Sequence, residues 1–340
     1  MTRSVRSLGH KFISRFKRAN SNVATKEDLY YCYQLLLNRK PDKIGYQHWL
    51  ELIEQTQMER RILVNLFLET EEFQKKRSQL KNERSQVTLP DFKMVVNPND
   101  FAIGSYIFET KIYEPHVSNA IKSQLKSGDT FVDIGANIGY FTLLAASIVG
   151  EKGQVYAFEP SPLNRELIKE NITLNGFSNV KIFPYAIAES KQTLNYHGGD
   201  INSNGQVSNI LPEQEGLFTV EAVALDDILL ESEKITVIKM DIEGAEARAL
   251  KGMSQIVSKF QPIIFTEFSP RLLAHVSDTS PQEYLTSLQE HYNLCILDIL
   301  ELKTELQNIK SRSISEIMEA HSHSGKMHLD LMAYPRKSTN

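Results

Sequence analysis

The segment from Phe131 to Thr142 constrains the fold most strongly. It reads F-V-D-I-G-A-N-I-G-Y-F-T: an apolar run carrying Asp133, then two glycines, then a second apolar run. This order is typical of a buried strand, a tight turn and a helix. Gly135 allows the backbone to turn sharply and to approach a ligand, and Gly139 allows the helix to begin close to the strand.

The spacing of these glycines indicates the kind of ligand. The turn is G-x-x-x-G, whereas G-x-G-x-x-G places a dinucleotide pyrophosphate on a helix N-terminus. S-adenosylmethionine (SAM) has no pyrophosphate, so the turn favours SAM. Asp133 can then bind the amino group of the methionine part, directly or through water. A purely structural turn is the alternative.

The next β-rich run strengthens this interpretation. V-Y-A-F-E-P ends in Glu159 and Pro160, and Glu159 follows the turn by about 20 residues, where doubly wound folds place the carboxylate that binds ribose hydroxyls. The alternative for Glu159 is an acid at the N-terminus of a helix that begins near Pro162.

A third run, V-I-K-M-D-I-E-G-A-E, places Asp241, Glu243 and Glu246 around the end of another strand. Ligands of open α/β sheets bind at the carboxyl ends of the strands. A helix dipole also favours acids in a first turn, which accounts for Glu243 and Glu246 better than for Asp241. Crowded carboxylates can raise one another's pKa or hold a divalent cation.

Beyond residue 88, β-rich and helical stretches alternate, which predicts a doubly wound, mainly parallel sheet. The predicted strands are Thr130–Ile134, Gln154–Phe158, Val180–Tyr185, Thr219–Val223, Ile235–Met240, Pro262–Phe268, Leu294–Ile299 and Leu329–Ala333. The predicted helices are 115–125, 141–148, 162–174, 245–259 and 281–291.

Several segments together resemble the FkbM family of SAM-dependent methyltransferases. They are V-D-I-G-A-N-I-G-Y-F-T, F-E-P at 158–160, A-L-D-D at 224–227, K-M-D-I-E-G-A-E at 239–246, and Tyr113-Glu114-Pro115. The resemblance covers about residues 90–335. It implies a Rossmann-like sheet with an antiparallel last strand, SAM as cofactor, and methyl transfer to oxygen, often on a sugar, a glycan or a natural product. One departure is Tyr185, where relatives more often carry Asn.

The resemblance and the motifs together give a set of site residues. The expected cofactor-binding residues are Glu114, Asp133, Gly135, Ala136, Asn137, Gly139, Glu159, Pro160 and Asp241. A base must take the proton of the acceptor hydroxyl. Asp241 is the first candidate, followed by Glu243 and Glu267, with His197 or His275 as alternatives. Substrate contacts are expected from the stretch 197–209.

A different pattern precedes this region. Thr25 and Asp28 resemble a helix start, and apolar residues then recur at helical spacing, with two further helices expected around Trp49 and over 62–73. L-L-L-N-R-K-P-D, G-Y-Q-H-W-L and F-L-E-T-E-E-F resemble the bacterial helical domain DUF4214. Trp49 can stack on a sugar or belong to the core. The predicted organisation is a basic tail over 1–24, this module over 25–80 and the methyltransferase domain over 88–340.

Composition limits the classes of partner that the chain is expected to bind. The formal net charge is −4, which does not predict a nucleic-acid binder. Cys32 and Cys295 lie far apart and fit a reducing, cytoplasmic compartment. Residues 1–20 carry six basic residues and no acid, so they are either a solvated tail or a peripheral membrane contact. His321, His323 and His328 are expected on a solvent loop or a substrate-facing lid rather than in a metal site.

Two other classes of function compete with the methyltransferase. An NAD-linked oxidoreductase would use the same sheet, but the missing G-x-G-x-x-G speaks against it. A non-catalytic glycan-binding adaptor would not need acids at 133, 159 and 241, all of which are present.

Overall fold

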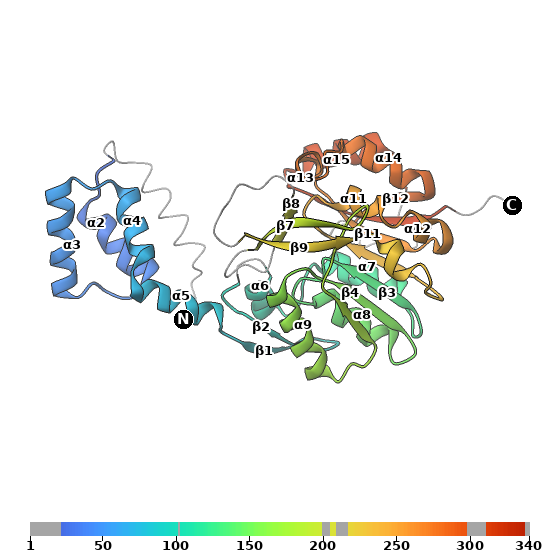
Figure 1. Cartoon of the computed structure of the whole chain (residues 1–340), viewed down its shortest axis with the longest axis horizontal. Helices are drawn as coiled ribbons and strands as arrows, with labels where there is room; N and C mark the ends of the chain where they lie inside the picture. The colour runs from blue at the N-terminus through green and yellow to red at the C-terminus, as the bar shows by residue number, and fades with distance from the viewer. Residues whose placement is uncertain (1–21, 101–102, 199–204, 209–216, 298–310, 337–340) are drawn as a thin grey trace. The chain divides into compact units, whose positions relative to one another are not determined.

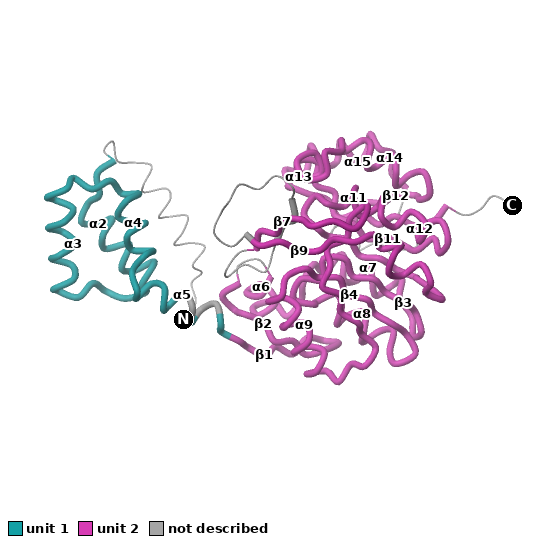
Figure 2. Tube along the Cα trace, in the orientation of Figure 1, with its two compact units in different colours: residues 1–83 teal, residues 84–340 magenta. Residues whose placement is uncertain are grey.

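A computed structural model of the chain describes residues 22–100, 103–198, 205–208, 217–297 and 311–336. The chain divides into two compact units, Met1–Glu83 and Arg84–Asn340 (Figures 1 and 2). The first unit is helical where it is described, and the second is built on β-sheets.

Over residues 22–83, the described part of the helical unit, there are five helical segments: α2 (Lys26–Tyr31), the π-helical turn η1 (Cys32–Leu36), α3 (Lys43–Thr56), α4 (Arg60–Glu69) and α5 (Glu71–Lys81). The predicted start at Thr25 is confirmed, because Thr25 and Asp28 form a capping box. The predicted single helix over 62–73 is wrong. The chain breaks at Thr70, which is extended and whose hydroxyl accepts the N–H of Phe73 at the start of α5.

Aromatic side chains form much of the core of this unit. The rings of Trp49 and Phe67 lie 4.7 Å apart, and Tyr33 packs edge-on against Phe67. Trp49 therefore serves the core, as one of the two interpretations predicted, although it keeps part of its surface exposed.

The second unit is organised around a seven-stranded sheet in the order β12-β13-β11-β10-β3-β4-β5. Its strands are β3 (Thr130–Ile134), β4 (Gln154–Phe158), β5 (Val180–Phe183), β10 (Val237–Met240), β11 (Ile263–Phe268), β12 (Tyr292–Leu297) and β13 (Leu329–Pro335). All neighbours pair in parallel except β13, which is antiparallel to both β11 and β12. The Rossmann-like methyltransferase sheet and its antiparallel last strand are thus confirmed.

Both faces of the sheet are buried. Since successive side chains of a strand point to opposite sides, each strand contributes residues to a core on each face. Phe131 and Val237 join the core on one face, whereas Val132 and Ile238 join the core on the other. The first face is covered by α6 (Gly104–Thr110), α7 (Pro115–Gln124) and α8 (Tyr140–Val149), together with the hairpin β1 (Ser85–Thr88) and β2 (Lys93–Val96). The second is covered by α10 (Leu225–Leu229), α11 (Glu246–Lys251), α12 (Ser254–Phe260), α13 (Pro270–Val276), α14 (Pro281–His291) and α15 (Ile314–Ser324). Helix α9 (Pro162–Asn175) follows β4 and contacts β2.

Three expectations about this unit are corrected. The predicted strand over 219–223 belongs to a second sheet of order β6-β9-β7-β8, formed by β6 (Ala186–Ile187), β7 (Gln192–Gly198), β8 (Gly205–Ser208) and β9 (Leu217–Val223). The predicted helix 245–259 is two helices, because Gly252 packs against the backbone of Ala188, where a Cβ would lie 1.9 Å from the carbonyl oxygen. His321 and His323 lie on α15 rather than on a loop, since Ser313 and Glu316 cap a helix there.

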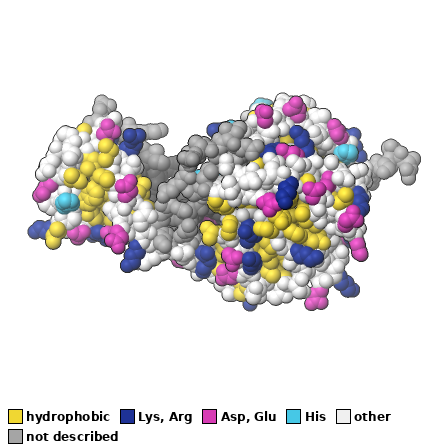
Figure 3. Space-filling view, in the orientation of Figure 1, with side chains coloured by type: hydrophobic (Ala, Val, Ile, Leu, Met, Phe, Trp, Pro, Cys, Tyr) yellow, Lys and Arg dark blue, Asp and Glu magenta, His cyan; other side chains and the backbone are white. Residues whose placement is uncertain are grey.

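The surface carries both signs of charge. Figure 3 shows acidic and basic side chains interspersed over the visible face of each unit. Within the described part of the chain, no helix combines the length and the apolar character that crossing a membrane requires. The basic segment 1–20 lies outside the described residues, so its membrane contact stays a prediction.

Candidate active site

The predicted glycine turn lies where the connections of the sheet change direction. β3 pairs in parallel with β4 on one side and with β10 on the other, and ligands bind at such a switch point. The N–H groups of Gly135 and Ala136 both donate to the carbonyl of Phe158 at 3.0 Å. Gly135 has a φ of +79°, and a Cβ there would lie 2.2 Å from the carbonyl oxygen of Asp241. Only glycine therefore allows the ends of β3 and β10 to approach this closely.

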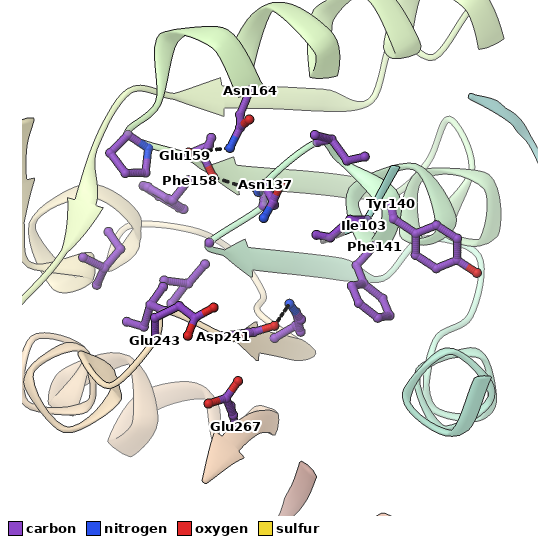
Figure 4. Close-up of a pocket in the computed structure, with 18 of the residues that line it drawn as sticks. Ile103, Asn137, Tyr140, Phe141, Phe158, Glu159, Asn164, Asp241, Glu243 and Glu267 are labelled. Atoms are coloured by element: carbon purple, nitrogen blue, oxygen red, sulfur yellow. Dashed lines mark hydrogen bonds and ion pairs between the residues drawn. The ribbon is translucent and has the colours of Figure 1, made fainter. Parts of the chain in front are cut away.

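Glu159 forms one end of the cavity that opens at this edge of the sheet. Its carboxylate accepts the backbone N–H groups of Asn137 and Ser161, both at 2.8 Å, and the side-chain amide of Asn164 at 3.4 Å (Figure 4). Burial raises its pKa to about 7. An ionised carboxylate offers about four acceptor positions, so Glu159 retains capacity for a ligand hydroxyl.

The wall near Glu159 is largely apolar. Phe158, Tyr185, Ile187 and Tyr196 line it, and the ring of Phe158 stacks on that of Phe183 at 4.8 Å. Tyr185, the departure noted in the sequence, thus lines the cavity. An apolar wall next to a carboxylate with remaining acceptor capacity has the chemistry that a nucleoside requires.

The opposite end of the cavity is acidic. Glu114, Asp241, Glu243 and Glu267 line it, and they come from the start of α7, the loop after β10 and the strand β11. Figure 4 shows Asp241, Glu243 and Glu267 directed toward a common space. Most of the expected site residues line this one cavity: Glu114, Gly135, Ala136, Asn137, Glu159, Pro160, Asp241, Glu243 and Glu267.

Two expected cofactor residues do not line the cavity. Gly139 has a φ of +94°, and a Cβ there would lie 3.1 Å from Ile168 of α9, so both the backbone and the packing favour glycine. Asp133 is fully buried, and its Oδ2 accepts the hydroxyl of Thr142 at 2.6 Å. Its other oxygen has no hydrogen-bond partner among the described residues. A direct contact between Asp133 and a cofactor stays a prediction.

The acids at the acidic end differ in protonation. Burial opposes ionisation of Asp241, but Lys239, whose ammonium lies 3.0 Å from Asp241 Oδ2, outweighs it and lowers the pKa of Asp241. Burial and the charge of Asp241 raise the pKa of Glu267 far above its ordinary value. The same two causes raise the pKa values of Glu114 and Glu243 to about 7. At neutral pH, Asp241 is therefore ionised and Glu267 protonated.

The backbone around the cavity is unusual as well. Glu114, Asn137 and Glu243 line it and have positive φ angles of 38°, 52° and 55°. Left-handed backbone at residues other than glycine costs roughly 1–3 kcal/mol each and clusters at functional sites. Glu246, which is buried and outside the cavity lining, accepts the N–H groups of Ile242 and Gly244 and so fixes the loop that carries Asp241 and Glu243.

Sequence reasoning missed several residues of the site. Lys239, Phe141 and Tyr196 line the cavity but were not proposed for it. His328, which was expected on a solvent loop or a substrate-facing lid, also lines the cavity, and its Nδ1 lies 3.8 Å from Glu267 Oε2. The signal in the sequence for Lys239 was its position two residues before Asp241, in V-I-K-M-D.

Neither His197 on β7 nor His275 on α13 lines the cavity. The expected substrate stretch 197–209 falls largely outside the described residues. Within the described ranges, no group of three or more His, Cys, Asp or Glu residues is arranged to hold a metal ion.

The cavity fits SAM on chemical grounds. SAM combines an adenosine with a methionine part whose sulfonium and ammonium are cationic. The apolar wall and Glu159 match adenosine, and the acidic end matches the cations. Burial and the charge of Asp241 raise the pKa values of Glu114 and Glu243 to about 7, so a bound cation at the acidic end would favour their ionised forms.

The sheet order and its antiparallel strand are those of Rossmann-like methyltransferases. Residues 133–293 match the methyltransferase FkbM domain, and residues 10–77 match DUF4214, a domain of unknown function. The chain therefore carries an FkbM methyltransferase domain behind a DUF4214 domain.

Known relatives share part of this region. The hexuronic acid methyltransferase AglP of Haloferax volcanii is 28% identical over 155 residues, which cover 44% of this chain and 61% of AglP. The methyltransferase sdnD of Sordaria araneosa is 28% identical over 168 residues, which cover 39% of this chain and 63% of sdnD. The chain thus spans a little under two thirds of the length of each.

Solved structures are similar at lower identity. A methyltransferase FkbM from Methylobacillus flagellatus is 15% identical with a TM-score of 0.39, over 89% of this chain and 58% of that one. A SAM-dependent O-methyltransferase from Thermotoga maritima is 14% identical with a TM-score of 0.39, over 76% and 88%.

Proposed function

We propose that the protein transfers the methyl group of SAM to a hydroxyl of a sugar, a glycan or a natural product. The observation that carries the proposal is the polarity of one cavity, with a hydroxyl-binding carboxylate and an apolar wall at one end and an acidic cluster at the other. The relation to a hexuronic acid methyltransferase supports a sugar acceptor.

The chain's part in the reaction is to position the acceptor and to take its proton. When bound, SAM supplies a methyl group on a sulfonium whose sulfur keeps the electron pair of the broken bond. Orientation of two reactants in one site can lower a barrier by roughly 7–11 kcal/mol. Glu159 and the turn at Gly135–Asn137 would hold the adenosine end, and Asp241 would face the acceptor oxygen.

Asp241 is the proposed general base. It is the carboxylate of the acidic end that stays ionised, and it lies in the cavity wall with 29% of its side chain exposed. Glu267 is protonated and so is suited to donate a hydrogen bond rather than to accept a proton. Glu243 titrates near neutrality and is the second candidate.

Substitution of the two candidates tests this assignment. We expect Asp241→Asn to retain SAM binding by calorimetry and to lose roughly 10²–10⁴-fold in kcat, the usual contribution of acid–base catalysis. Glu243→Gln is the matched control and should lose far less. Two results together would assign the role of general base to Glu243 instead. These are full turnover by Asp241→Asn and loss of the acidic limb of the pH–rate profile in Glu243→Gln.

The general claim has its own test. Thermal stabilisation of the protein by SAM but not by NAD is expected, and methylation of an acceptor from a panel of glycosides should follow. Stabilisation by NAD alone would point to an oxidoreductase, and SAM binding without turnover on any acceptor would favour an adaptor.

A further inference from the structure

The side chain of Lys239 lies in an environment where a lysine is rarely found. It is the third residue of β10, between Ile238 and Met240, and its side chain is 8% exposed. Its ammonium lies over the ring of Phe141, 4.8 Å from the centroid. Withdrawal of an ammonium from water costs several kcal/mol unless it is paired, so the partners of Lys239 explain why it is there.

Three carboxylates from three parts of the fold face this ammonium. Asp241 is in direct contact at 3.0 Å. Asp133 is the partner of Lys239 in the register of β3 and β10, and Glu114 shares the cavity wall with Lys239. Burial disfavours the charged form of Lys239, but Asp241, Asp133 and Glu114 raise its pKa above the ordinary value.

We propose that Lys239 is a positioning residue that holds the Asp241 carboxylate ionised and oriented at the end of the cavity where methyl transfer would occur. This inference rests on the proposed role of Asp241. The ion pair limits the rotation of the Asp241 side chain. The backbone N–H of Asp241 donates to the carbonyl of Ile134, and among the described residues no other Lys or Arg forms an ion pair with the Asp241 carboxylate. The remaining groups around Asp241 are mostly acids and cannot replace the lysine. These groups are Tyr113, Glu114, Asp133, Glu243, Glu246, Glu267 and His328.

The variant Lys239→Met tests the proposal because it keeps most of the length of the side chain and removes its charge. Without the ammonium, burial and the neighbouring acids should raise the pKa of Asp241. A carboxyl whose pKa is raised in the folded state contributes stability at low pH, and that contribution is lost as pH rises through the raised pKa. As pH rises from about 4, the ordinary pKa of an Asp carboxyl, toward the raised pKa, Lys239→Met should therefore lose thermal stability more steeply than the wild type.

A double variant isolates the effect of Asp241. In Lys239→Met/Asp241→Asn the carboxyl that titrates is absent, so the extra pH dependence should disappear. The double variant should also fold if Lys239→Met alone does not, since both members of the pair are gone. Lys234→Met is the matched control. Lys234 is 54% exposed and helps to lower the pKa of Asp129 before β3, so its loss should change the pH dependence of stability only at acid pH.

The readout on function is the pH–rate profile of the SAM-loaded enzyme. We expect the acidic limb of kcat to move upward by at least one pH unit in Lys239→Met, with recovery of activity at high pH and little change in the KM for the acceptor. Lys239→Arg, which keeps the charge, should restore the position of the limb.

Two results would overturn the inference. One is an unchanged pH dependence of stability in Lys239→Met. The other is an extra pH dependence that persists in the double variant, which would assign it to another group. The stability measurements need neither cofactor nor acceptor. If the protein failed to bind SAM, the proposed function would fail while the coupling between Lys239 and Asp241 would still be measured.

Discussion

Replacement of Gly135 by alanine probes the contact on which the cavity depends. Two effects add up at this position. A residue other than glycine at a φ of +79° costs roughly 1–2 kcal/mol, and the new Cβ would lie 2.2 Å from the carbonyl oxygen of Asp241 and 2.8 Å from Cγ2 of Ile242. Forcing atoms into a packed interior costs a further 1–3 kcal/mol or so. We therefore expect Gly135→Ala to lower the free energy of unfolding by about 3 kcal/mol.

Gly176 offers a matched control within the same unit. It ends α9 with a φ of +67°, and a Cβ there would meet no atom within 4 Å. Gly176→Ala should thus show the backbone effect alone, about 1 kcal/mol. The difference between the two variants measures the contact between the turn after β3 and the loop after β10.

Urea unfolding followed by far-UV circular dichroism gives the required free energies. Trp49 is the chain's single tryptophan and lies in the helical unit. Its fluorescence therefore reports the unfolding of the helical unit, which serves as an internal reference. SAM affinity should fall at least tenfold in Gly135→Ala and stay unchanged in Gly176→Ala. Equal destabilisation by the two substitutions would refute the argument, because the close approach to Asp241 would then have no energetic weight.

Three further predictions concern the cofactor, pH and the tail. Glu159→Ala should weaken SAM binding about tenfold in calorimetry while the protein stays folded, because a buried acceptor for a ligand hydroxyl is worth roughly 1–3 kcal/mol; unchanged affinity would remove Glu159 from the cofactor site. Burial raises the pKa of Glu246 to about 7, so the stability that Glu246 contributes at low pH is lost as pH rises through 7. Between pH 6 and pH 8, Glu246→Gln should therefore lose about 1.4 kcal/mol less free energy of unfolding than the wild type, as measured by urea unfolding. The same dependence of this free energy on pH in both proteins would contradict the prediction. Deletion of residues 1–20 should release the protein from acidic liposomes without altering SAM affinity, since each basic residue near such a surface contributes roughly 1 kcal/mol. If the full-length protein does not co-sediment with the liposomes, the interpretation of residues 1–20 as a solvated tail is the one that remains.

The sequence was sufficient to predict most strands of the central sheet, and most of the expected site residues line one cavity. Strands β3 and β4 were predicted with their observed ends, because each is an apolar run that a turn terminates. Asp241 and Glu159 could be placed together because the carboxyl ends of parallel strands share one edge of the sheet.

Features that depend on distant contacts could not be predicted in this way. The burial of Lys239 depends on carboxylates from β3 and the start of α7, which are more than 100 residues away in the sequence. The second sheet pairs β6 with β9 between residues 36 apart in the sequence, and the two residues of β6 are too few to give a periodic signal. The break between α11 and α12 follows from the packing of Gly252 against Ala188, which no local pattern reveals.

The antiparallel strand β13 has a consequence for biosynthesis. In the sheet, β13 lies between β11 and β12 and pairs with both of them, although it is the last described strand in chain order. While the ribosome extends the polypeptide, 263–268 and 292–297 are complete before their shared partner 329–335 has been made. Unpaired strand edges of this kind invite association with other chains. We expect nascent chains stalled before residue 329 to depend on chaperones and to aggregate when released, whereas chains that extend past residue 335 close the sheet by themselves.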